Sequence, residues 1–109
     1  PFTREQRMEF VLREDVAAAV AAAVRRPDTR GHIFNVAGGI TWQMTGQEYS
    51  DAYFAAFGIA SEEAGFIGES TKFDFFDTTA TVSSLGFYPT IFPAYLKRVE
   101  GAIQKALED

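Results

Sequence analysis

The chain has 109 residues, of which 47% are hydrophobic and 23% charged. These values are ordinary for one soluble globular domain. A formal net charge of −5 argues against a nucleic-acid partner, because that binding needs clustered Lys and Arg. The absence of cysteine excludes disulfides and thiolate metal sites and favours a cytoplasmic protein. No apolar run reaches membrane-spanning length, so no membrane partner is expected.

The N-terminal third predicts a strand, a helix and a second strand. Residues 10–12 form a short β-like run, and Asp15 has a side chain that N-cap positions prefer. The helix that follows carries Val at every fourth position with Ala between, so its slim face can approach another backbone closely. Pro27 stops this helix, and a turn leads to a strand over residues 32–36 that ends at the glycine pair 38–39.

The segment after the glycine pair carries the clearest helix signal. Thr45 and Glu48 form a capping box, in which each side chain satisfies an amide that has no partner at a helix start. Apolar and aromatic side chains then recur at helical spacing up to Phe57, and Gly58 suits the position just past the helix end. We therefore expect a helix between Thr45 and Gly58.

The C-terminal third predicts two more helices. Phe73 and Phe75 alternate with polar residues, which fits a short strand or an extended segment. Asp77 then caps a brief helix that Gly86 ends, and an amphipathic helix closes the chain. These elements predict a single α+β domain over residues 1–109, with about four helices and two or three short strands.

Few residues offer chemistry. His32, the one histidine, has no second ligand at metal-binding spacing and is interpreted as a strand-edge residue. The glycine pair 38–39 could cradle a phosphate, but the capped helix starts several residues too late, so a strand end that needs positive φ is favoured. Asp77 is interpreted as a helix cap rather than as half of a carboxylate pair with Asp74. We therefore assign no catalytic residue, metal site or cofactor-binding site within this chain.

Three short motifs follow one another along the chain: a strand-to-helix step, a strand that ends in glycine, and a late Leu-Gly-Phe-x-Pro preceded by an aspartate. They consist of Phe10, Val11, Asp15, Val16, Ala17 and Ala19; of Phe34, Asn35, Val36, Ala37 and Gly39; and of Asp77, Leu85, Gly86, Phe87 and Pro89. In this order they resemble the C-terminal part of the extended short-chain dehydrogenases, the NAD(P)-dependent nucleoside-diphosphate-sugar epimerases and dehydratases. The resemblance covers nearly the whole chain.

The resemblance implies that the chain is the substrate-binding C-terminal portion of an α/β Rossmann-type enzyme without its dinucleotide-binding half. In the family, the glycine loop for NAD or NADP and the Tyr-x-x-x-Lys catalytic pair lie upstream, so this chain is expected to be catalytically silent alone. Family members often carry an arginine at the position of Met8, where this chain has Arg7 one residue off, and another where the nearest cation is Lys72. Arg7 and Lys72 are therefore the candidate residues for binding a nucleotide-sugar.

Other functions stay open. A free-standing small-ligand-binding or oligomerisation module would need no enzyme half, whereas a small enzyme acting alone is disfavoured because no acid–base pair is found. A chain separated from its Rossmann half would leave apolar surface uncovered, on the Ala/Val helix face or beside residues 32–36, so we expect a homo-oligomer. The start at Pro1 fits a trimmed initiator methionine or excision from a longer protein.

Overall fold

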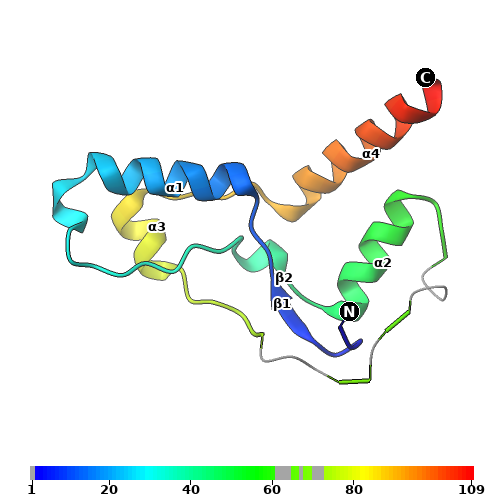
Figure 1. Ribbon diagram of the computed structural model, residues 1–109, viewed down its shortest axis with the longest axis horizontal. Helices are drawn as coiled ribbons and strands as arrows, with labels where there is room; N and C mark the ends of the chain where they lie inside the picture. The colour runs from blue at the N-terminus through cyan, green and yellow to red at the C-terminus, as the bar shows by residue number, and fades with distance from the viewer. Residues whose placement is uncertain (1, 61–64, 67, 70–72) are drawn as a thin grey trace.

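Four α-helices and a two-stranded sheet make up the described part of the fold (Figure 1). The computed structural model describes residues 2–60, 65–66, 68–69 and 73–109. The strands and α-helices in chain order are β1 (Arg7–Glu9), α1 (Arg13–Arg25), β2 (Gln43–Thr45), α2 (Gly46–Ala56), α3 (Thr79–Leu85) and α4 (Phe92–Glu108), and two short 3-10 helices, Pro27–Thr29 and Ile40–Trp42, lie between α1 and β2. The predicted α+β class, with about four helices and two or three short strands, is confirmed, and the number of strands is two.

The sheet pairs β1 with β2 in antiparallel register, with Met8 opposite Met44. Both methionines are buried, because successive residues of a strand face opposite sides and these two face the core. The prediction of a strand over residues 10–12 is wrong. There the backbone leaves the sheet, and Val11 and Leu12 enter two different hydrophobic clusters.

The first cluster, called the Trp42 cluster, joins the sheet to α2 and α4. Its buried members are Met8, Trp42, Met44 and Phe92. The rings of Trp42 and Phe92 lie 4.8 Å apart, and the indole Nε1 of Trp42 donates to the carbonyl oxygen of Thr90 at 2.8 Å. A buried indole with its N–H satisfied combines a large apolar area with a fixed orientation.

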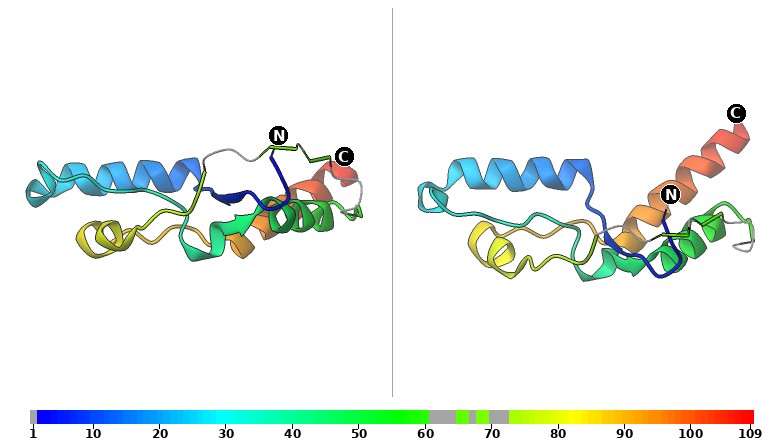
Figure 2. Two further views of the ribbon diagram at one scale, coloured as in Figure 1. Left: turned by 90° about the horizontal axis from the view of Figure 1, so that it is seen from below. Right: turned by 60° about the horizontal axis from the view of Figure 1, so that its bottom comes forward.

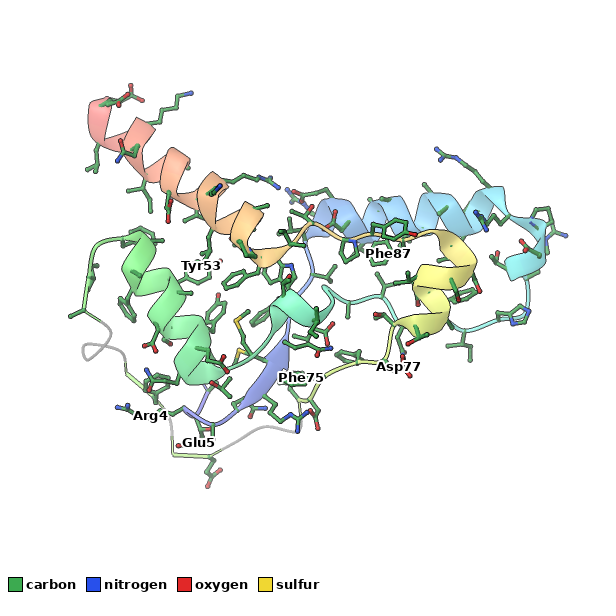
Figure 3. The ribbon with its side chains drawn as sticks, turned by 180° about the vertical axis from the view of Figure 1, so that it is seen from behind. Arg4, Glu5, Tyr53, Phe75, Asp77 and Phe87 are labelled. Carbon is green, nitrogen blue, oxygen red and sulfur yellow. The ribbon has the colours of Figure 1, made fainter. Side chains whose placement is uncertain are left out.

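The second cluster, called the Phe87 cluster, joins α1 to α3. Its buried members are Ala19, Leu85 and Phe87, with Phe34 and Val36 packed against them. The alanine-rich inner face of α1 gives this cluster its close packing, as the Val/Ala pattern predicts. Phe87 lies between α1 and α3 in Figure 3.

Helix ends follow the predicted chemistry in two places. Thr45 accepts a hydrogen bond from the Glu48 amide, the Glu48 carboxylate accepts one from the Thr45 amide, and Gly58 follows α2 with φ 72°. Gly86, with φ 61°, ends α3 as expected. Both glycines occupy the left-handed region that residues with a Cβ rarely adopt.

Of the two aspartates predicted as helix caps, Asp15 has a different role and Asp77 keeps its own. Asp15 is not an N-cap: α1 begins at Arg13 after Leu12, which makes no side-chain cap, and the Asp15 carboxylate accepts hydrogen bonds from the amide and hydroxyl of Thr90. Asp77 accepts from the amide of Thr79, the first residue of α3, so it caps that helix as expected, although it precedes the N-cap residue.

Residues 32–36 form no paired strand, so that prediction is also wrong. Phe34 and Val36 nevertheless face the Phe87 cluster, while Ile33 points away and is 94% exposed. In the described part of the chain, the amides of residues 33–38 donate to no backbone carbonyl. Hydrogen bonds to α3 and to the residues just before it hold this segment instead: Thr81 Oγ1 donates to the Asn35 carbonyl oxygen, and Asn35 Nδ2 donates to the Asp77 carbonyl oxygen. The segment has the alternation of a strand without a neighbouring strand.

The molecule is flat, as Figure 2 shows, with extents of 49 × 39 × 17 Å and a radius of gyration of 16.5 Å. A compact domain of this length has a radius of gyration of about 13 Å. The accessible surface is 7620 Å², roughly 1,600 Å² more than the ~6,000 Å² expected of a compact protein of 12.0 kDa. The two clusters therefore form a single thin layer with large uncovered faces.

Candidate functional site

An apolar cleft lies between β1 and residues 73–76. Its volume is about 490 Å³, within the range of small-ligand sites. The lining consists of Phe2, Gln6, Met8, Glu9, Phe10, Phe73, Asp74 and Phe76. Four phenylalanines and a methionine give an apolar surface suited to a flat ring, with polar groups only at a few points.

Glu9 holds the two sides of the cleft together. Its Oε1 accepts a hydrogen bond from the Phe76 amide at 2.9 Å and from Gln43 Nε2 at 3.0 Å, and its Oε2 accepts from the Gly39 amide at 2.9 Å. One half-buried carboxylate thus joins the sheet, the glycine pair and the 73–76 segment. A carboxylate can serve several donors at once, which a neutral side chain of this size cannot.

Gln6 adds a second tie across the cleft. Its Nε2 donates to the carbonyl oxygen of Phe73 at 3.1 Å and to that of Arg7 at 2.9 Å. Through Glu9 and Gln6, the cleft wall formed by residues 73–76 is fixed to β1 by hydrogen bonds although no strand pairing occurs there. Of the two alternatives predicted for Phe73 and Phe75, the strand is not formed.

Arg7 lies at the outer edge of the cleft and does not line it. Its Nε meets Asp74 Oδ1 at 2.8 Å, and its guanidinium lies 4.3 Å from the centroid of the Phe75 ring. The two charged side chains are 57% and 65% exposed, so solvent screens the pair and its contribution to stability is about 0–1 kcal/mol. Arg7 neighbours Met8 on a strand, and its side chain therefore points to the opposite face. Figure 3 shows Phe75 beside β1.

Lys72, the other candidate substrate-binding residue, lies outside the described residues. The structure therefore places only Arg7 of the predicted pair, at the rim of the cleft. Two carboxylates, Glu9 and Asp74, line the cleft, and Arg7 at its rim already has an acidic partner. This charge distribution favours a neutral or aromatic group inside the cleft and leaves the rim as the place for an anionic group.

The glycine pair 38–39 serves the backbone rather than a phosphate. Gly39 has φ 86°, which confirms the predicted need for positive φ, and its amide is already bound by Glu9. A Cβ at Gly38 would overlap the carbonyl oxygen of Phe10 and the Trp42 ring. Gly38 thus permits the close crossing of two segments.

Sequence reasoning missed Glu9 and the aromatic lining. A glutamate directly after a buried strand position is a weak signal, since most such residues face solvent. The aromatic lining was missed because large apolar side chains are usually buried in a core, whereas Phe73 and Phe76 remain at least half exposed. His32, expected at a strand edge, is exposed and has Phe34 as a ring neighbour at 6.2 Å.

Neither a metal centre nor a membrane helix is evident in the described ranges. Among residues 2–60, 65–66, 68–69 and 73–109, no group of three or more His, Cys, Asp or Glu side chains is placed to hold a metal ion. Over the same part of the chain, none of the helices combines the length and the apolar character needed to cross a bilayer. Comparison with protein-family models, with curated proteins and with solved structures finds no match.

Proposed function

We propose that the chain is the substrate-binding C-terminal part of an NAD(P)-dependent oxidoreductase of the nucleoside-diphosphate-sugar epimerase and dehydratase type, and that it is catalytically silent alone. The observation that carries the proposal is the segment 32–36. It alternates like a strand and packs one side on the Phe87 cluster, yet its described backbone has no neighbouring strand. This is the segment whose sequence resembles a sheet strand of that family.

The uncovered surface supports the same proposal. An excess of roughly 1,600 Å² is about twice what one partner buries in a standard protein–protein interface. A domain that has lost a large interface with another domain would expose an excess of surface of this size. Ile33 on the lone segment and Val20 and Val24 on α1 are among the exposed apolar side chains that such a half would cover.

The cleft supplies the substrate side of the proposed enzyme. Its phenylalanines offer ring faces to a nucleobase or to the apolar face of a sugar. Arg7 at the rim would contact the diphosphate of a nucleotide-sugar bound in the cleft. Hydride transfer and acid–base chemistry would belong to the dinucleotide-binding half, with NAD or NADP as its cofactor. Such an enzyme would act in the cytoplasm.

The coding sequence ahead of Pro1 tests the proposal first. We expect it to encode a glycine-rich strand–helix–strand unit and a Tyr-x-x-x-Lys pair. A start codon immediately ahead of Pro1 would contradict the proposal.

A substitution in the cleft tests the proposed role in the longer protein. Phe76→Ala should raise the KM for a nucleotide-sugar about tenfold and leave NAD(P) affinity unchanged, because Phe76 lines only the substrate side. Tyr88→Ala is the matched control, since Tyr88 is 82% exposed and lies outside the cleft. An unchanged KM in Phe76→Ala would show that the cleft does not bind the nucleotide-sugar.

A free-standing oligomerisation module is the second candidate, because the same exposed apolar surface can be covered by further copies of the chain. The predicted homo-oligomer fits both functions. Sedimentation over a wide concentration range measures the oligomeric state of the isolated chain. We expect self-association, and a strict monomer at high concentration would exclude the oligomerisation module.

A further inference from the structure

A smaller cavity has five aromatic side chains among its seven described lining residues. This aromatic groove, of about 170 Å³, lies among residues 10–12, Trp42, α2 and α4. Its lining consists of Phe10, Val11, Leu12, Trp42, Tyr49, Tyr53 and Tyr95. It shares only Phe10 with the cleft described above, and no role in nucleotide-sugar binding has been assigned to the other six residues.

The five rings follow one another around the groove. Phe10 lies 5.1 Å from Tyr49, Tyr49 4.7 Å from Tyr53, Tyr53 6.3 Å from Tyr95, and Tyr95 5.3 Å from Trp42, each between ring centroids. Neighbouring rings are tilted by 42°, 43°, 57° and 37° in the same order. Because each ring is inclined to the next, they do not form a flat stack and can surround a small group from several sides.

The polar atoms of these rings are engaged with one another or with the backbone. Tyr53 donates its hydroxyl proton to the Tyr95 hydroxyl at 2.7 Å, and Trp42 Nε1 is held by Thr90. Burial, with the hydrogen bond to Tyr95, raises the pKa of Tyr53, so its phenol stays neutral. Figure 3 shows Tyr53 on α2 facing α4.

The electrostatics of the groove favour a cation. Aromatic rings carry negative charge on their faces, and no charged side chain is among the described residues that line the groove. The chain as a whole has a net charge of −5, which attracts cations at long range. A compact organic cation suits this lining, because the ring faces attract positive charge and the described lining contains no side chain of the same sign that would repel it.

We propose that the aromatic groove binds a quaternary ammonium group through cation–π contacts with the accessible rings of Phe10, Tyr49, Tyr53 and Tyr95, next to the buried ring of Trp42. The group can belong to a small molecule or to a trimethylated lysine side chain, since both present the same trimethylammonium head. This site is independent of the proposed oxidoreductase function.

Trp42 is the only tryptophan, so its fluorescence reports on the groove directly. The chain is titrated with choline chloride at constant ionic strength set by NaCl, and in parallel with 3,3-dimethylbutanol, which has the same shape without the charge. We expect saturable quenching by choline at millimolar concentration and at least fivefold weaker binding of the alcohol. Equal binding of the alcohol, or no saturable binding of choline, would overturn the proposal.

Two variants of Tyr49 separate the ring from the hydroxyl. Tyr49→Leu should weaken choline binding about fivefold to tenfold, because one ring is lost, whereas Tyr49→Phe should retain it within about twofold. Tyr88→Leu, far outside the groove lining, should change nothing. Equal affinities of Tyr49→Leu and the unaltered chain would contradict the site, with thermal melting used to confirm that each variant is folded.

Peptides distinguish the two sources of the ammonium group. A short peptide with one trimethyllysine is compared with its unmodified counterpart and with choline. Peptide binding at least tenfold tighter than choline assigns the groove to a methylated protein, and equal or weaker binding assigns it to a small molecule.

Discussion

The Trp42 cluster and the Phe87 cluster differ in how their backbone is held. Around Trp42, two paired strands, a capping box and the Thr90 contact fix the chain, and the cluster has α2 and α4 on its flanks. Around Phe87, a slim helix and the short α3 hold the segment 32–36 through side-chain hydrogen bonds. Only one of the two clusters thus has a sheet.

The difference marks the side of the molecule on which we propose that the missing half binds. In the Trp42 cluster, the backbone groups of β1 and β2 pair with each other, so these strands need no partner from another protein or domain. The Phe87 cluster has a strand-like segment whose described amides meet no backbone partner, and Ile33 beside it faces solvent. The proposed dinucleotide-binding half would join the molecule on this side.

The largest expected effect is on the stability of the two clusters. Trp42→Ala should lower the free energy of unfolding by about 5 kcal/mol, because a 3% exposed ring and its hydrogen bond to Thr90 are lost. Phe87→Ala should cost about 3 kcal/mol, since the thinner Phe87 cluster can collapse around the cavity more easily. Urea denaturation measures both, and equal losses would remove the distinction between the clusters.

Glu9→Gln comes next, at about 2 kcal/mol. Glutamine keeps one acceptor oxygen and turns an N–H toward at least one of the three donors that Glu9 now serves. Glu5→Gln is the matched control, because Glu5 is exposed and should shift stability by less than about 0.5 kcal/mol. Equal effects of the two variants would show that Glu9 does not hold the cleft together.

Helix capping gives a smaller comparison between the clusters. Thr45→Ala should destabilise the chain by about 1 kcal/mol, because it removes the side-chain acceptor for the Glu48 amide. Thr78→Ala, at the N-cap of α3, should have little effect, since Thr78 makes no side-chain cap. Thermal melting of both variants measures the difference, and a larger loss in Thr78→Ala would contradict the assignment of the caps.

The smallest effect is a pH dependence at α3. Hydrogen bonds from Thr79 lower the pKa of Asp77 below its usual 3.8. A lowered pKa means that Asp77 stabilises the fold above pH 3.8 and that this contribution is lost as the pH falls toward the folded value. Asp77→Asn should therefore flatten the decline in melting temperature below about pH 4, and an unchanged slope would contradict the contact.

Local signals were predicted well from the sequence, and distant pairings were not. The Thr45–Glu48 box and the glycine at 86 act within a few residues, so their patterns suffice. The strand position failed because β1 is set by Met8 meeting Met44, and Asp15 was taken for a cap because its partner, Thr90, lies at the other end of the chain. The cleft was missed for the same reason, since Glu9 gathers donors from three separate segments.

Native-state hydrogen exchange of the isolated chain tests the central claim most directly. If residues 32–36 are a strand whose neighbours belong to another half, the amides of residues 33–37 should exchange within about tenfold of unstructured-peptide rates, while amides inside α2 are protected far more strongly. Protection of residues 33–37 equal to that of α2, in a sample shown to be monomeric, would contradict the account.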